Sequence, residues 1–150
     1  MNGTIHHIEI YVSDLEKTKL FWEWLLTSKF SYTKFQEWQH GVSFKLKDTY
    51  IVFVQTEDDY LDVAYHRKRT GLNHLAFHCD SKVFVDKLTV ELKEKDVTIL
   101  YADKYPHAED YYAVFLKIRI GLKLKLFVQG NLSQLTKSFL TNFWFRLSLS

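Results

Sequence analysis

Hydrophobic and polar residues alternate over residues 5–13, as they do in a half-buried β-strand. The alternation places His7, Glu9 and Tyr11 on one face, opposite an apolar face. Asp14 follows as a suitable N-cap for a helix over LEKTKLFWEWLL, residues 15–26. Three later runs are rich in aromatic and β-branched residues and predict further strands at residues 29–35, 41–48 and 49–55. The first third of the chain therefore predicts a βαβββ unit.

The same pattern recurs at a constant offset of 67 residues. Aligning Ile5 with Leu72 puts His7 on His74 and Val12 on Cys79, which indicates an internal repeat. The second copy predicts a strand over 72–79, a helix capped by Asp80 or Ser81 that runs to Lys95, and strands over 97–102, 110–118 and 122–128. A polar loop over about residues 57–70 joins the copies.

These elements predict an α+β fold in which two tandem βαβββ modules form a curved mixed sheet around a cleft, with the helices outside. The halves span about residues 5–56 and 72–128 of a single domain over residues 1–130. Residues 131–150 form an atypical C-terminal tail.

Histidines occupy equivalent positions in the two copies. His7 and His74 begin equivalent strands, and His74, Ala76 and His78 share the polar face of the second one. Two imidazoles related by a pseudo-twofold suit a divalent metal such as Zn, Ni, Mn or Fe, which binds neutral ring nitrogen. A lone histidine on a strand is more often a structural hydrogen-bonding residue, but the repeat favours a metal site for this pair. Glu9 is a candidate general base on the same face as His7, with a solvated carboxylate as the alternative.

Composition limits the class of protein. With 150 residues and 47% hydrophobic residues, the chain can fill one core. No run approaches 18 apolar residues, and the N-terminus lacks the pattern of a signal peptide, so we expect a cytoplasmic protein that does not bind membranes. The single cysteine, Cys79, lies in an apolar run and is expected to be a buried thiol.

The net charge of +2 conceals a change in the content of acidic residues near residue 116. All 18 acidic residues lie within residues 1–115, together with 14 basic ones, whereas the last 35 residues contain six basic residues and no acidic one. Residues 1–115 have the charge of an ordinary soluble domain. The basic total therefore does not indicate a protein that binds nucleic acid.

Three segments resemble the vicinal oxygen chelate superfamily, which contains glyoxalases, bleomycin resistance proteins and extradiol dioxygenases. They are IHHIEIYVSDLEKTKLFW, GLNHLAFH and YAVF, and the resemblance covers about residues 5–115. It implies paired βαβββ modules, a small-molecule ligand and a homodimer. Metal-using members have a histidine on the first strand, a second on the fifth and a glutamate on the last, so His7 and His74 match two ligand positions. On the fourth strand, where members similar to glyoxalase I add a glutamate, this chain offers Phe53 and Gln55.

After YAVF the superfamily usually continues with a turn similar to FEDPDG and then an acidic strand. This chain continues LKIRIGLKLKLFVQG, which puts Lys125 at the position of the ligand glutamate. A message that encodes FEDPDRIEIEVVRSR encodes LKIRIGLKLKLFVQ once its first base is deleted. A frame shift is therefore one explanation of the break, and an ordinary C-terminal extension is the other. Because an ammonium group repels a dication, Lys125 is expected to weaken metal binding.

Three functions remain open at this point. By resemblance, the first is a lyase or isomerase similar to glyoxalase, in which a metal polarises adjacent oxygens of a small substrate. The second is a metal-independent drug-binding protein of the bleomycin-resistance type, and the third is an inactive product of a frame-shifted gene. The candidate substrate contacts are Tyr11, Phe53, Gln55, His66, Arg67 and His78.

Overall fold

The computed structural model describes residues 2–105 and 111–129. It divides the chain into two compact units, Met1–His66 and Arg67–Ser150. The tail predicted over residues 131–150 lies outside the described residues.

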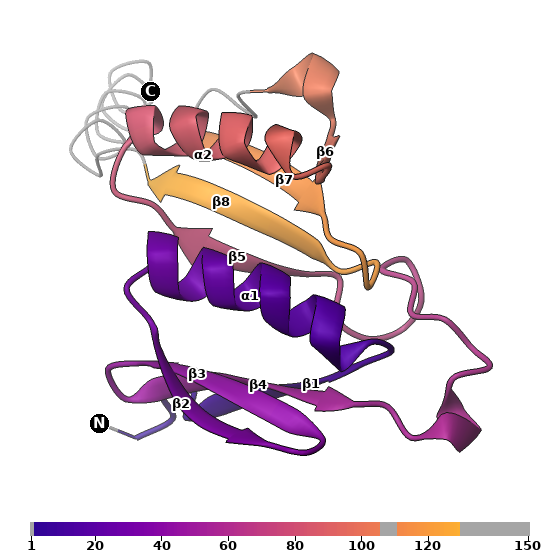
Figure 1. Cartoon of the computed structure of the whole chain (residues 1–150). Helices are drawn as coiled ribbons and strands as arrows, with labels where there is room; N and C mark the ends of the chain where they lie inside the picture. The colour runs from indigo at the N-terminus through magenta and orange to yellow at the C-terminus, as the bar shows by residue number, and fades with distance from the viewer. Residues whose placement is uncertain (1, 106–110, 130–150) are drawn as a thin grey trace, which may run out of the picture. The chain divides into compact units, whose positions relative to one another are not determined.

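The first unit contains a four-stranded mixed sheet with one helix (Figure 1). Its elements are β1 (His7–Val12), α1 (Leu15–Lys29), β2 (Thr33–Trp38), β3 (Gly41–Leu46) and β4 (Thr49–Gln55), followed by a 3-10 turn over Asp58–Tyr60. The strand order is β1-β4-β3-β2, with β1 and β4 parallel and the other neighbours antiparallel. Helix α1 covers one face of this sheet.

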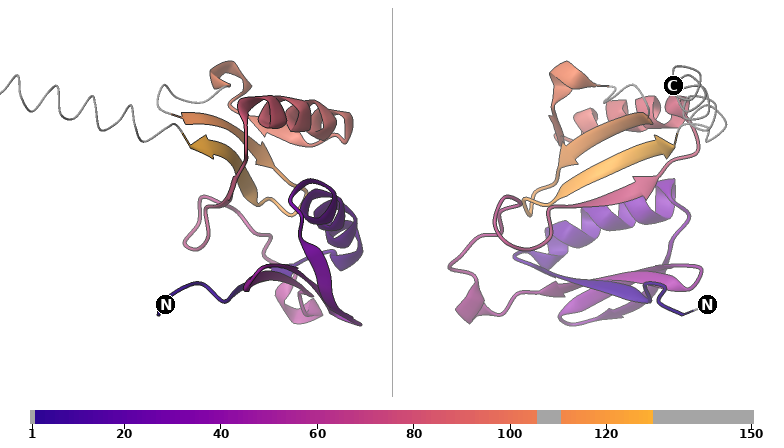
Figure 2. Two further views of the ribbon diagram at one scale, coloured as in Figure 1. Left: turned by 90° about the vertical axis from the view of Figure 1, so that its left-hand side faces the viewer. Right: turned by 180° about the vertical axis from the view of Figure 1, so that it is seen from behind.

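The second unit repeats this arrangement (Figure 2). Its elements are β5 (His74–His78), α2 (Lys82–Glu94), β6 (Thr98–Leu100), a 3-10 turn over Ala102–Lys104, β7 (Tyr111–Lys117) and β8 (Lys123–Gln129). The strand order β5-β8-β7-β6 is equivalent to that of the first unit, with β5 and β8 parallel. The predicted α+β class and the two βαβββ modules are confirmed.

Helix α1 begins where the sequence predicts. The Asp14 carboxylate accepts a hydrogen bond from the Lys17 backbone N–H at 3.0 Å, which satisfies one of the unpaired donors of the first turn. The buried stripe includes Trp22, whose ring packs on Phe53 with 4.7 Å between centroids. The strand predicted over residues 29–35 is wrong in its bounds. The helix continues to Lys29, Ser31 turns the chain with a φ of 59°, and β2 begins only at Thr33.

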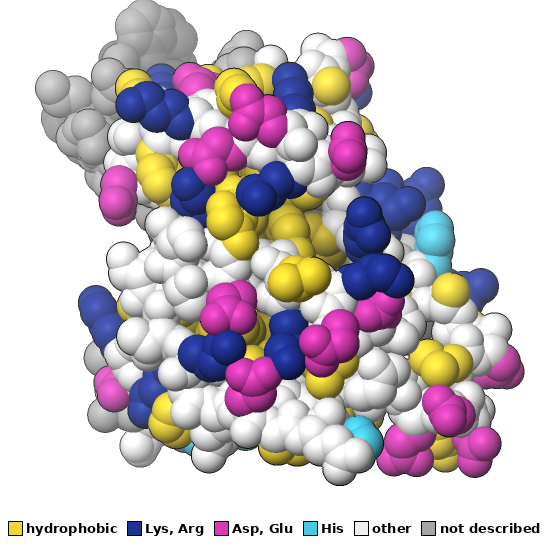
Figure 3. Space-filling model, in the orientation of Figure 1, with side chains coloured by type: hydrophobic (Ala, Val, Ile, Leu, Met, Phe, Trp, Pro, Cys, Tyr) yellow, Lys and Arg dark blue, Asp and Glu magenta, His cyan; other side chains and the backbone are white. Residues whose placement is uncertain are grey.

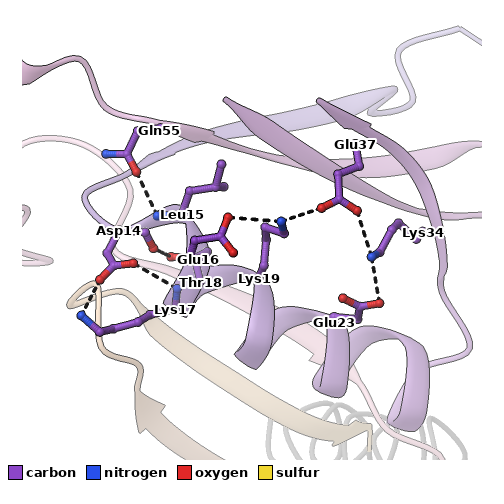
Figure 4. Close-up of polar contacts among 10 residues, drawn as sticks. All are labelled: Asp14, Leu15, Glu16, Lys17, Thr18, Lys19, Glu23, Lys34, Glu37 and Gln55. Carbon is purple, nitrogen blue, oxygen red and sulfur yellow. Dashed lines mark hydrogen bonds and ion pairs between the residues drawn. The ribbon is translucent and has the colours of Figure 1, made fainter. Parts of the chain in front are cut away.

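Charged side chains join α1 to β2 (Figure 4). Lys19 lies 2.5 Å from a Glu37 oxygen, and Lys34 lies 3.0 Å from both Glu23 and Glu37. The two ammonium groups lower the pKa of Glu37, and its carboxylate in turn raises the pKa of each lysine. Figure 3 shows acidic and basic side chains interspersed over α1, as expected of a solvated helix face.

The unusual run LKLKLFV packs as an ordinary strand. Leu124 and Leu126 are fully buried, whereas Lys123 and Lys125 lie on the opposite face of β8. The run therefore alternates between buried and less buried residues, as a half-buried strand does, although its polar residues are lysines.

Cys79 is buried, as predicted, and desolvation raises the pKa of its thiol to about 11. Neither α1 nor α2, the two α-helices of the described residues, is long and apolar enough to cross a membrane.

Candidate functional site

The open face of the first sheet, opposite α1, carries the predicted polar residues of β1. His7, Glu9 and Tyr11 are exposed, while Ile8, Ile10 and Val12 lie on the α1 side. The His7 ring stacks on Tyr50 of β4, with 4.9 Å between centroids and 5° between planes. Its Nδ1 lies 3.0 Å from Nδ1 of His6, and the two rings meet edge to face. Tyr50 and His6 thus orient the His7 ring, a role that the sequence pattern alone did not indicate.

The structure corrects two of the predicted substrate contacts, Phe53 and Gln55 of β4. Phe53 is fully buried and packs on Trp22, so it belongs to the core beneath α1 and not to an exposed binding surface. Gln55 lies on the same side of the sheet. Its Oε1 accepts a hydrogen bond from the Leu15 backbone N–H at 2.9 Å (Figure 4). Its Nε2 donates to the Ser13 carbonyl oxygen at 3.2 Å. The Gln55 side chain therefore links the start of α1 to β4 by hydrogen bonds.

Tyr50, Val52 and Val54 occupy the face of β4 that His7 shares. The parallel register pairs His7 with Tyr50, Glu9 with Val52 and Tyr11 with Val54, and paired residues of adjacent strands point to the same face. None of these three β4 residues carries a carboxylate. The fourth strand consequently offers no acidic ligand beside His7.

His74 begins β5 in the second unit and is half-buried. Its Nδ1 lies 2.9 Å from Asn73 Oδ1, so Nδ1 donates to that oxygen and Nε2 carries the lone pair of the neutral ring. Asn73 is itself held by a hydrogen bond from its Nδ2 to the Arg67 carbonyl oxygen at 2.9 Å. Burial, followed by the charges of Lys123 and Lys125, lowers the pKa of His74. The neutral form of the ring is thereby favoured.

The two lysines of β8 lie beside this histidine on the open face of the second sheet, opposite α2. The register pairs Lys123 with His74 and Lys125 with Ala76. The Lys123 ammonium lies 5.4 Å from the ring centroid of Phe115, and that of Lys125 lies 5.5 Å from the same centroid. Lys125 also lies 4.6 Å from the ring centroid of Phe127. This surface, formed by His74, Lys123, Lys125, Phe115 and Phe127, is called the lysine face below.

The remaining predicted contacts lie on different segments of the chain. His78 is exposed at the end of β5, with its ring 5.5 Å from that of Phe127. His66 is exposed at the end of the first unit, and Arg67 is half-buried at the start of the second. Neither His66 nor Arg67 belongs to a strand.

The donors on these two faces do not fit a divalent metal ion. A third ligand of the His-His-Glu type needs an anionic oxygen, yet β8 presents the ammonium groups of Lys123 and Lys125 beside His74, and both act on that imidazole as positive charges. Within each unit, the described residues contain no group of three His, Cys, Asp or Glu side chains that could hold a metal. His74 has the tautomer of a metal ligand, but its surroundings disfavour a dication.

A family model, a relative of known sequence and a solved structure each match most of this chain. A family model described as the glyoxalase/bleomycin resistance protein/dioxygenase superfamily matches residues 6–115. The uncharacterized protein YqjT of Bacillus subtilis strain 168 is 44% identical over 124 residues, which cover 81% of this chain and 96% of YqjT. The crystal structure of a candidate glyoxalase from Bacillus halodurans is 46% identical, with a TM-score of 0.82, and the match covers 85% of this chain and 96% of that one.

A more distant structure shares the fold. The fosfomycin resistance protein FosX of Listeria monocytogenes, in a complex with Mn(II) and sulfate, has a TM-score of 0.66 at 18% identity, and the match covers 92% of this chain and 99% of FosX. At this identity the likeness concerns the fold alone. The family match ends at Phe115, directly before the segment in which the composition changes.

Proposed function

Because the chain belongs to the glyoxalase/bleomycin resistance protein/dioxygenase superfamily, we propose that it binds a small organic molecule without a catalytic metal. The observation that carries this proposal is the pair of ammonium groups, Lys123 and Lys125, beside His74. By the resemblance, Lys125 takes the position at which metal-using members of the family place a glutamate. A metal-independent binding protein needs no such glutamate, and aromatic residues such as Tyr50 and Phe127 lie on the open faces of the two sheets.

The second candidate is a metal-dependent lyase or isomerase whose site has been damaged. By the resemblance, His7 and His74 correspond to two ligand positions of the family, and Nε2 of His74 carries a lone pair. In that case Glu9 could act as a general base on the face of His7. A frame shift near residue 116 would explain why the family match stops at residue 115 and why lysines replace acids on β8. The chain would then be an inactive descendant of an enzyme.

Metal titration separates these candidates. From strand geometry, the Cα atoms of His74 and Lys125 are about 8 Å apart, because the strands are about 4.8 Å apart and the residues are displaced by about 6.6 Å along them. At about 8 Å, a dication and an ammonium repel by roughly 1 kcal/mol in water and roughly 4 kcal/mol at an effective dielectric of about 20. Lys125→Glu turns this repulsion into attraction, so a latent metal site should gain at least about thirtyfold in affinity.

The experiment measures Zn, Ni and Mn binding by calorimetry to the wild-type chain, Lys125→Glu and a matched control, Lys87→Glu. Lys87 is exposed on α2 and undergoes the same change of charge away from the lysine face. We expect no uptake at micromolar metal by the wild-type chain. Micromolar binding that His74→Ala abolishes would overturn the metal-independent proposal. A gain in Lys125→Glu that requires both His7 and His74, and is absent in Lys87→Glu, would establish descent from a metalloenzyme.

A further inference from the structure

The second sheet is unusual in its charge. Strands β5, β6, β7 and β8 contain no aspartate or glutamate, but they contain Lys117, Lys123 and Lys125 together with two histidines. The acidic residues of this unit that lie in a regular element include Asp86, Glu91 and Glu94 of α2, which covers the other face of the sheet. Helix α2 also carries Lys82, Lys87 and Lys93 and is therefore balanced in charge, whereas the strands of the sheet are basic.

Strand register brings these charges together. Lys123 is paired with His74 on one side and with Lys117 on the other, whereas Lys125 is paired with Ala76 and Phe115. Adjacent strands lie about 4.8 Å apart, and residues two apart on one strand are separated by about 6.6 Å. The ammonium groups of Lys123 and Lys125 can therefore reach the same small ligand. Like charges this close repel each other, so a bound anion would remove an unfavourable interaction.

Aromatic rings hold both lysines. Phe115 is buried, and the two ammonium groups lie at nearly equal distances from its ring centroid, 5.4 and 5.5 Å. Phe127 makes a second such contact with Lys125 at 4.6 Å. Cation–π attraction restricts long side chains that otherwise sample many rotamers, so less entropy is lost when a ligand binds.

The strand beside Lys125 leaves room for a ligand. Ala76, its register partner, is exposed and has no side chain beyond Cβ, while His74 and His78 flank it on the same face of β5. An anionic group placed over Ala76 could accept hydrogen bonds from the lysines and contact the edge of an imidazole.

We propose that the lysine face binds the oxyanion group of a small molecule, either a phosphate-type or a carboxylate group, with Lys123 and Lys125 as its cationic contacts. The proposal deepens the proposed function and rests on it, because it assigns to lysines the ligand contact that a metal would otherwise make. Recognition is by charge and hydrogen bonding, and the aromatic rings beneath the lysines position them.

The test is titration of inorganic phosphate into the full chain at low ionic strength, in buffer freed of metals by a chelating resin, followed by calorimetry and by NMR shifts of the β5 and β8 amides. We expect Lys123→Gln and Lys125→Gln each to weaken binding by at least about threefold and the double variant by about tenfold, since partly exposed charge pairs contribute modestly. Lys87→Gln, on the exposed side of α2, is the matched control and should change nothing. Circular dichroism checks that each variant is folded. If the double variant does not fold, the two single variants are sufficient for the test.

Two further titrations define the ligand class. Stronger binding of phosphate than of acetate supports a phosphate-type group, and equal binding supports a carboxylate. If neither anion binds at about 20 mM, or if Lys87→Gln weakens binding as much as Lys125→Gln, the proposal is wrong. Micromolar binding of a ten-nucleotide single strand that the lysine substitutions abolish would replace the small anion with nucleic acid. Because the buffers contain no metal, failure here is distinct from metal uptake, which is measured separately as the test of the proposed function.

Discussion

Gln55 is predicted to stabilise the first unit and not to contact a ligand. Its side chain makes three hydrogen bonds, accepting from Leu15 N–H at 2.9 Å and donating to the carbonyl oxygens of Ser13 at 3.2 Å and Thr56 at 3.1 Å. Each is worth about 1 kcal/mol net, so Gln55→Ala should lower the free energy of unfolding by about 2–3 kcal/mol. Gln55→Glu keeps the acceptor near the N-terminus of α1 but loses both donors, so we expect an intermediate loss of about 1–2 kcal/mol.

Urea unfolding followed by tryptophan fluorescence is a suitable assay, because Trp22, Trp24 and Trp38 lie in the first unit and Trp22 is fully buried there. With a slope of about 1–1.5 kcal/mol per molar urea, Gln55→Ala should lower the midpoint by roughly 1.3–3 M. Gln36→Ala, at an exposed position of β2, is the control. A loss below about 0.5 kcal/mol, or one no larger than that of the control, would refute the structural role of Gln55 and restore it as a candidate ligand contact.

Two further predictions concern Cys79 and the coding sequence. The pKa of the Cys79 thiol is raised from 9.0 to about 11, so iodoacetamide at pH 8 should modify the folded chain roughly a hundredfold more slowly than the urea-unfolded chain, and equal rates would contradict its burial. Because the folded state holds this proton more tightly, its contribution to stability should be complete below about pH 9 and lost as the pH rises through 11. If the frame has shifted, inserting one base near codon 116 of the gene should open a frame that encodes an acidic, proline-containing turn and a carboxylate aligned with Lys125. An early stop codon in that frame would favour a genuine extension.

Several features of the fold could be predicted because they depend on local sequence. The period of two in β1 and β5, and the offset that relates His7 to His74, follow from residues that alternate clearly between polar and apolar. Asp14 could be predicted as the cap of α1 because N-capping is a contact between neighbours in sequence. The basic character of β8 was equally visible, since Lys123 and Lys125 alternate with leucines.

The sequence could not assign the two faces of β4. The run TYIVFVQ has apolar residues on both faces of the strand, so its pattern does not show which residues face the helix. A shift of the strand register by one residue would exchange the two faces. Pairing with β1 and packing against Trp22 decide that Phe53 and Gln55 face α1, while Tyr50 and Val52 share the face of His7. The end of α1 at Lys29 likewise depends on a turn at Ser31, which the aromatic run over residues 29–35 did not reveal.

The environment of His74 depended most on tertiary structure. The sequence separates His74 from Lys123 and Lys125 by about fifty residues, and only the parallel pairing of β5 with β8 makes them neighbours. Electrostatic interaction falls with distance in space and not with distance along the chain. The repeat in the sequence thus predicted that His74 resembles a metal ligand, whereas tertiary structure determined that the ring is partly buried and lies beside two lysine charges, which together lower its pKa.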